Sequence, residues 1–162
     1  MISEAAIRTR LVLLIREHDS AAQVHRRRRY PKDGRIDEYQ RLYMSDELKL
    51  INAYSIRRFR REPLMRGIPG RLVSVTYDFG IRFYRHLIDT DDDGAASEET
   101  AQAAIDSLAA KFEADITLGL GRTVSHEGLR MPLDFEDVLL GDWPAHRADL
   151  RLTVKVSSAN CD

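Results

Sequence analysis

An unbroken alternation of apolar and polar residues between Arg71 and His86 constrains the fold of this chain most strongly. The apolar positions are Val73, Val75, Tyr77, Phe79, Ile81 and Phe83, and the intervening positions are Ser74, Thr76, Asp78, Gly80, Arg82 and Tyr84. Six alternations in a row match the two-residue period of a strand, whereas a helix would spread these apolar residues around its axis. The segment is therefore predicted to be a long strand with one face on a core.

Two other segments show the spacing of amphipathic helices. The first follows Ser3, a residue type that caps helices, and has Glu4 in its first turn. The second is predicted over residues 97–115, with Ser97 as its N-cap. The stripes consist of Ile7, Leu11, Leu14, Ile15 and His18 in the first helix, and of Ala101, Ile105, Leu108, Ala109 and Phe112 in the second. Each helix therefore has one side that can pack on a sheet.

Shorter elements are predicted elsewhere. Strands are expected over residues 48–59, 124–139 (one or two strands, interrupted near Pro132) and 149–156, a short helix over 36–42, and a short strand or extended arm over 23–30. Two prolines and two glycines mark residues 63–70 as a turn or exposed loop. Gly119 and Gly121 are interpreted as a helix stop, with glycine in the left-handed conformation.

The length of 162 residues and the hydrophobic fraction of 43% predict one domain with a substantial core. The expected fold class is α/β (α+β), with a mainly antiparallel mixed sheet and two helices packed on one face. This domain is expected to span residues 1–162, with a basic, extended segment at 23–35 and a loop at 62–71.

Charge is divided unevenly along the chain although the formal net charge is only −1. Residues 1–86 hold 19 Lys or Arg and 10 Asp or Glu, a balance of +9, whereas residues 87–162 hold 6 and 16, a balance of −10. Such asymmetry is found in nucleic-acid-binding arms. It is equally found in subunits whose positive side meets the negative side of a neighbour.

The sequence predicts a protein of a reducing cytoplasm. Its one cysteine, Cys161, cannot form an internal disulfide. The first ten residues carry Glu4, Arg8 and Arg10 and lack the apolar run of a signal peptide. No stretch has the length and apolarity of a membrane span, so no membrane association is expected.

An acidic loop matches the first half of a calcium-binding EF-hand loop. Asp89, Asp91, Asp93 and Gly94 follow its D-x-D-x-D-G pattern. The second half fails, because Thr100 stands where a bidentate glutamate is required and because a strand, not a helix, leads into the loop. The loop is interpreted as a solvated turn before a helix, and no metal site is predicted.

The run from Arg26 to Arg29 is the strongest basic feature. It could bind a phosphate backbone, with Tyr30, Tyr43 and Phe59 available for stacking. No nucleic-acid-binding motif accompanies it, so a solvated or subunit-contacting patch is favoured and direct nucleic-acid binding is not expected. The candidate subunit contacts are Arg26, Arg27, Arg28, Arg29, Arg57, Arg58, Asp89, Asp91, Asp92 and Asp93.

Catalytic and cofactor signatures are not recognisable in the sequence. The histidines at 18, 25, 86, 126 and 146 form no pair with helical metal-ligand spacing. Any Ser/His/Asp combination lacks the glycine pattern of a nucleophile elbow. The passage from Gly119 to Arg122 lacks the Lys-Ser/Thr of a phosphate loop. Neither enzymatic activity nor a cofactor is therefore predicted.

Several passages carry a family resemblance. Residues 113–121 (EADITLGLG) look like an ADxTLGG passage, except that Leu120 separates the two glycines. Val24 and His25 before an aromatic and basic stretch, residues 50–58 (LINAYSIRR), and the closing residues 148–156 (ADLRLTVKV) fit the same pattern. Together with the order of elements, these passages resemble the tail-terminator and related neck proteins of long-tailed bacteriophages.

The resemblance implies a ring-forming structural protein, typically a hexamer, that caps the tail tube and joins it to the head connector. Its partners would be further copies of itself, the tail tube protein and a head-completion or connector protein. It would have no catalytic residues, would be made in the host bacterial cytoplasm and would reside in the virion. A head-to-tail ring needs two different complementary patches on each subunit, and the divided charge can supply them.

Two alternatives belong to other classes. One is a small nucleic-acid-binding protein that acts through Arg26–Arg29 and through the basic residues 57–61; its signature would be a strongly salt-dependent affinity for DNA. The other is a host-directed inhibitor whose acidic half masks a nucleic-acid-binding surface.

Overall fold

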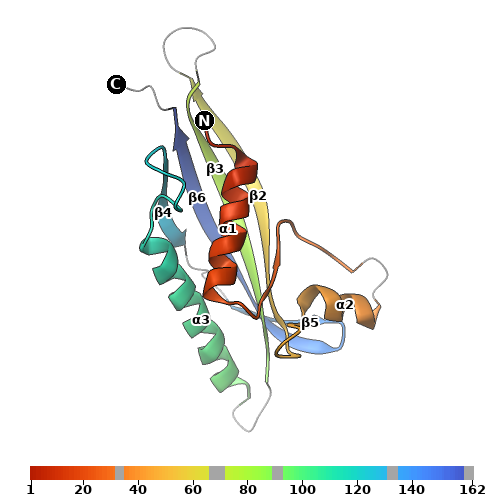
Figure 1. Ribbon diagram of the computed structural model, residues 1–162. Coiled ribbons are helices and arrows are strands. Elements are labelled where there is room, and N and C mark those ends of the chain that lie inside the picture. Colours follow the sequence, from red (N-terminus) through yellow and green to blue (C-terminus); the bar gives the residue numbers. More distant parts are fainter. Residues whose placement is uncertain (32–34, 66–71, 89–92, 131–134, 159–162) are drawn as a thin grey trace.

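Among the residues that the computed structural model describes, 1–31, 35–65, 72–88, 93–130 and 135–158, a six-stranded mixed sheet carries two long helices on one face (Figure 1). The elements in chain order are α1 (Glu4–His18), β1 (Gln23–His25), α2 (Ile36–Tyr43), β2 (Asn52–Met65), β3 (Leu72–His86), α3 (Ala95–Glu113), β4 (Val124–Arg130), β5 (Glu136–Leu140) and β6 (Trp143–Ser157). The predicted α+β class with a mainly antiparallel sheet is confirmed.

The strand order is β1-β2-β3-β6-β4, and β5 also pairs with β6. β1 runs parallel to β2, and the other pairs are antiparallel. β3 pairs with β6 along nearly its whole length, so β4 and β5 share the other edge of β6. β5 lies beside the beginning of β6, with Glu136 opposite Arg147, and β4 lies beside its end, with Val124 opposite Val156.

The main core lies between α1, α3 and one face of the sheet. In its middle Phe79 lies opposite Leu152 and Ile81 opposite Leu150, and all four are fully buried. The alternation predicted for β3 is therefore confirmed, with Val75 to Phe83 buried at the odd positions. The helix stripes are buried as expected: Ile7, Leu11, Leu14 and Ile15 in α1, and Ala101, Ile105, Leu108, Ala109 and Phe112 in α3.

A second, smaller core lies on the opposite face, beneath α2. Its buried members are Leu42, Tyr43, Ile51, Ala53, Tyr84, Leu140 and Ala145. Tyr84 alternates with the buried Phe83, so its side chain points to the other face of β3. Its ring meets Tyr43 of α2 edge-on, with centroids 5.1 Å apart. The sequence predicted the short helix α2 but not this core.

The start of α3 differs from the prediction. The helix begins at Ala95, and its N-cap is Gly94 with a φ of 85°, a conformation that favours glycine. Ser97 lies inside the first turn, where its hydroxyl donates to the carbonyl of Gly94 at 2.9 Å. Ser97 was therefore wrong as the N-cap, because a residue type that caps helices can also bond back to its own turn.

The boundaries of β2 also differ. The strand begins at Asn52 and continues through Pro63 to Met65, where a turn or exposed loop had been expected. β3 pairs with one edge of β2, whereas β1 covers the other edge only between Ala53 and Ser55. Proline is compatible with a strand whose outer edge needs no donor. Residues 66–70 of the expected loop lie outside the described residues.

The passage at 113–121 forms a turn rather than a helix stop at glycine. α3 ends at Glu113, and the main-chain nitrogen and hydroxyl of Thr117 donate to Asp115 at 3.0 and 2.6 Å. Leu118 is fully buried in a left-handed conformation with a φ of 55°. Gly119 and Gly121 follow with positive φ, so the predicted left-handed glycines are present but lie beyond the helix end.

Candidate interaction surfaces

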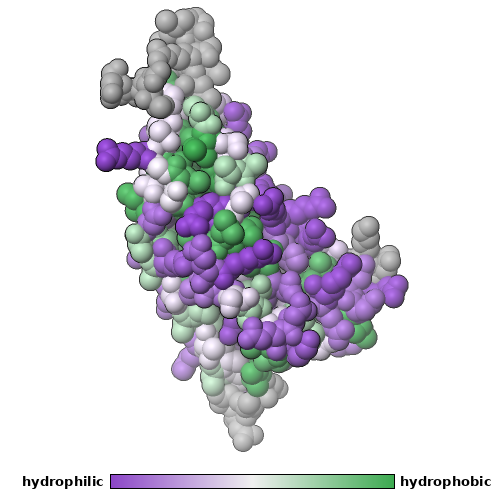
Figure 2. All heavy atoms as spheres, viewed as in Figure 1, coloured by the Kyte–Doolittle hydropathy of each residue, from purple (hydrophilic) through white to green (hydrophobic). Residues whose placement is uncertain are grey.

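A basic groove of about 490 Å³ separates α1 from the arm, the residues 26–31 that follow β1. Its lining comprises Arg8, Thr9, Val12, Leu13 and Arg16 of α1, with Val24, His25, Arg26, Arg27 and Arg29. Five arginines and no carboxylate line this α1–arm groove. Figure 2 shows hydrophilic side chains gathered over the arm and α2, bordering an apolar patch over α1.

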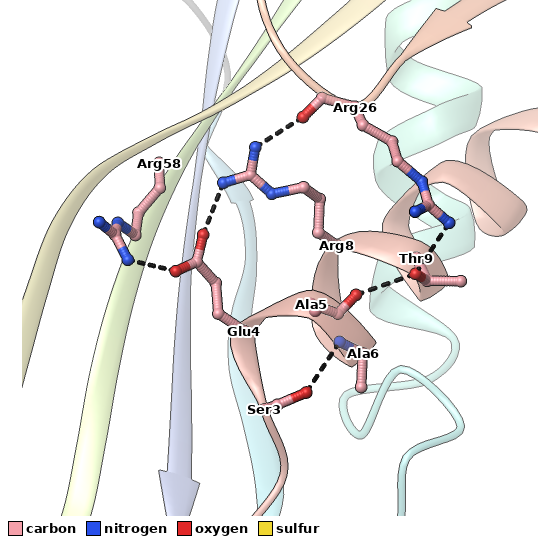
Figure 3. Close-up of polar contacts among 8 residues, drawn as sticks. All are labelled: Ser3, Glu4, Ala5, Ala6, Arg8, Thr9, Arg26 and Arg58. Atoms are coloured by element: carbon pink, nitrogen blue, oxygen red, sulfur yellow. Dashed lines mark hydrogen bonds and ion pairs between the residues drawn. The ribbon is translucent and has the colours of Figure 1, made fainter.

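Hydrogen bonds hold the wall of the α1–arm groove in place (Figure 3). Arg8 donates to the carbonyl of Arg26 at 2.6 Å and to Glu4 at 2.6 Å. Arg26 donates to the hydroxyl of Thr9 at 3.0 Å. Glu4 also pairs with Arg58, which reaches α1 from β2. Arg26 and Arg58, two of the predicted contact residues, therefore serve the fold by tying the arm and β2 to α1.

The other arginines of the groove are not compensated in this way. Arg16, Arg27 and Arg29 are exposed, and their guanidinium groups form no hydrogen bond or ion pair within the described part of the chain. Like charges gathered at one site repel one another, and an incoming anion relieves that repulsion. The groove therefore carries positive charge that the described residues do not neutralise.

Arg28 differs from its neighbours in the run. Its guanidinium group lies 3.4 Å from Asp149 of β6, which also accepts two hydrogen bonds from Arg82 at 2.7 and 2.6 Å. Partial burial alone would raise the pKa of the Asp149 carboxyl, but the hydrogen bonds and charge of Arg82, assisted by Arg28, hold that pKa below its usual value. Arg28 is thus part of a network on the sheet face opposite α1 and α3.

Arg57 also belongs to that open face, whereas Arg58 points toward α1. The guanidinium carbon of Arg57 lies 5.3 Å from the ring centroid of Phe59, a cation–π distance. Phe59 covers Gly80 so closely that a Cβ at Gly80 would come within 2.1 Å of the ring. The six predicted basic contacts are therefore distributed over three places: the α1–arm groove, the Glu4 pair and the open face.

The acidic residues among the predicted subunit contacts lie at and before the start of α3. Of the predicted acidic contacts, Asp93 is exposed with a φ of 55°, and Asp89, Asp91 and Asp92 lie outside the described residues. Glu98 and Glu99 are exposed in the next turn. Within the described ranges, no group of three or more His, Cys, Asp or Glu is placed to hold a metal ion.

A Ser–His–Asp chain of hydrogen bonds lies behind the start of α3. The hydroxyl of Ser97 lies 2.8 Å from Nε2 of His146, and Nδ1 of His146 lies 2.8 Å from Asp137 of β5. Ser97 is 9% exposed and His146 is 2% exposed. Ser97 does not line the α1–arm groove, and its hydroxyl also donates to Gly94 and accepts from the main chain of Ile88 at 3.3 Å.

This chain of hydrogen bonds is a structural tie between α3 and the hairpin of β5 and β6. A nucleophilic serine must present its oxygen to a substrate, whereas the Ser97 oxygen is enclosed by its own helix turn and the imidazole. This contact was not predictable from local sequence patterns, because 49 positions separate Ser97 from His146 and the sheet brings them together.

The comparisons with known proteins add no family. No protein-family model matches the chain, and no curated protein matches it. Among the described residues, no helix combines the length and apolarity that crossing a bilayer requires.

Proposed function

We propose that this chain is a structural virion protein of a long-tailed bacteriophage, a tail terminator whose copies form a ring at the head-proximal end of the tail. The ring, a hexamer in this proposal, caps the tail tube and joins it to the head connector. The family-like passages at 113–121 and 148–156, together with the order of helices and strands, support the proposal.

The structural observation that supports the proposal is that positive and negative side chains without ion-pair partners among the described residues lie at two separate places. Arg16, Arg27 and Arg29 face an open groove, and Asp93, Glu98 and Glu99 are exposed at the start of α3. A head-to-tail ring requires two different patches that complement each other between neighbouring copies. Opposite charges at two patches attract the correct faces and repel the wrong ones, which fixes the register of a ring.

Electron microscopy of phage lysates tests this function. Deletion of the gene from its phage should leave unjoined heads and tails, or tails of uncontrolled length. The variant Arg27→Glu/Arg29→Glu should give the same particles from a folded protein, because both side chains line the groove and have no acidic partner among the described residues. Arg122→Glu, an exposed arginine between α3 and β4, is the matched control and should give normal virions.

Normal virions in the deletion would contradict a structural role in the particle. Normal virions only in the double variant would retain the role and remove Arg27 and Arg29 from the ring contacts.

The five arginines that line the α1–arm groove are one observation in favour of the nucleic-acid-binding alternative. A protein that neutralises several phosphates loses affinity linearly on a plot of log K against log salt concentration. Duplex DNA titrated into the wild type at several salt concentrations should show no such steep dependence. A steep slope that becomes shallower in Arg27→Glu/Arg29→Glu would replace the ring proposal by DNA binding.

A further inference from the structure

We infer that the α1–arm groove receives the start of α3 from a second copy of this chain. The inference rests on the proposed function in that it names the two surfaces by which neighbouring copies meet. It adds a second wall to the site, because Arg8 and Arg16 of α1 face the arm across the groove. The sequence pointed to the arginine run alone.

The groove combines an apolar floor with a cationic rim. Val12 and Leu13 of α1 lie among its lining residues, and Leu13 is 45% exposed although its helix packs on the sheet. Arg16 and Arg27 stand on the two sides. A partner that suits this groove offers an apolar side chain flanked by carboxylates, because a phosphate backbone alone would leave the apolar floor uncovered.

The start of α3 has the matching composition. Ile88 is 47% exposed, and Asp93, Glu98 and Glu99, which follow it in the chain, are exposed. The main-chain nitrogen of Ile88 donates to the hydroxyl of Ser97, which His146 holds from the sheet. This contact holds the main chain of Ile88 beside the first turn of α3, and a contact residue that is already held in place loses less conformational entropy on binding.

The two surfaces cannot satisfy each other within one copy. α3 begins at the lower end of the molecule in Figure 1, whereas the groove lies higher, between α1 and the arm. In the described residues Glu98 accepts a hydrogen bond from Gln102, and no contact joins Asp93, Glu98 or Glu99 to an arginine of the groove. Contact between two different patches is heterologous, so it propagates from copy to copy and closes into a ring where the rotation permits.

A charge exchange tests the pairing in the full-length protein. One variant, Arg16→Glu/Arg27→Glu, makes the groove acidic, and a second, Glu98→Lys/Glu99→Lys, makes the start of α3 basic. In sedimentation velocity at low salt, the wild type should associate as its concentration rises and dissociate as salt is added. Each variant alone should remain a monomer, and an equimolar mixture of the two should regain association. Arg122→Glu should associate like the wild type.

Circular dichroism and thermal melting establish that each variant is folded before its association is measured. A monomeric wild type at every concentration and salt level would overturn the inference. So would undiminished association of either folded variant, or a mixture of folded variants that stays monomeric. A labelled single-stranded oligonucleotide that binds the wild type, fails to bind Arg16→Glu/Arg27→Glu and dissolves the assembly would assign the groove to nucleic acid instead.

The result is independent of the test of the proposed function. If deletion of the gene leaves heads and tails unjoined while the charge exchange fails, the protein acts in the virion through other contacts. If the charge exchange succeeds while the deletion yields normal virions, the groove is a self-association surface of a protein with another role.

Discussion

The two faces of the sheet are stabilised in different ways. The face beneath α1 and α3 carries a continuous apolar core that runs from Tyr54 through Phe79 to Leu152. Among the described residues, the apolar cluster of the opposite face lies under α2, and elsewhere this face uses polar pairs such as Arg82 with Asp149 and Thr153 with Asp78. The first face therefore determines the fold, whereas the second holds charged groups near solvent in pairs with one another.

Truncating a side chain on the closed face of the sheet, the face beneath α1 and α3, should lower stability most. Leu108 of α3 is fully buried, so Leu108→Ala is expected to lower the free energy of unfolding by about 2–5 kcal/mol. Chemical denaturation monitored by circular dichroism measures the change. Ser107→Ala, at the neighbouring exposed position, is the control and should change stability by less than about 0.5 kcal/mol. An equally small change for Leu108→Ala would remove it from the core.

Removing the hydroxyl of Ser97 at the start of α3 should have the next largest effect on stability. Ser97→Ala leaves Nε2 of buried His146 and the main-chain nitrogen of Ile88 without their partner, which is expected to cost about 1–3 kcal/mol. Thr100→Ala is the control, because the exposed Thr100 hydroxyl only donates back to Ala96 of its own helix. Equal stabilities of the two variants would show that the Ser97–His146 contact contributes nothing to the fold.

A polar pair on the open face should contribute less and should depend on pH. The folded-state pKa of Asp149 lies below its ordinary value near 4, so its contribution is fully present above that value and is lost as the pH falls through the folded-state pKa. Because Asp149 is nearly half exposed, Asp149→Asn is expected to cost about 1 kcal/mol at neutral pH. Denaturation measured between pH 7 and pH 2 should show the two proteins converging in acid. A constant difference across that range would contradict the assigned role.

The sequence predicted the closed face well because its signal is periodic and local. The two-residue period of β3 and the helical stripes of α1 and α3 are each visible within one segment, and burial on a sheet follows from them. The second core was not predictable in this way. Tyr84 comes from a strand whose alternation already explained it as outward-facing, and Ala145 precedes the strand predicted over 149–156. Only the position of α2 turns that side into a core.

The candidate surfaces were predictable by composition but not by pairing. The sequence identified Arg26 to Arg29 as one basic run. The local sequence does not indicate which of these guanidinium groups pairs with a carboxylate, because the partners lie far away in the chain. Arg28 meets Asp149, 121 positions away, whereas Arg26 meets Thr9 of α1. The contributions of Arg8 and Arg16 to the groove were missed because helical spacing assigned them only to the solvent side of α1. The available signal was that Arg8 and Arg16 both lie outside the apolar stripe of the first predicted helix.

The smallest expected effects on stability come from charge reversals within the arginine run. They compare Arg28, which lies on the open face, with Arg27 and Arg29, which line the groove. Arg28→Glu places a carboxylate beside Asp149 and removes a partner from it, so it is expected to lower the free energy of unfolding by about 1 kcal/mol. Arg27→Glu/Arg29→Glu changes twice the charge, but these side chains meet no carboxylate among the described residues and line a groove of like charges. Its effect should stay within about 0.5 kcal/mol of zero. Denaturation at low and high salt distinguishes the two cases, because added salt screens the new repulsion in Arg28→Glu and should bring its stability toward that of the wild type. A double variant that is less stable than Arg28→Glu would mean that Arg27 and Arg29 support the fold, and the groove would then lose its surplus charge as an argument for a partner.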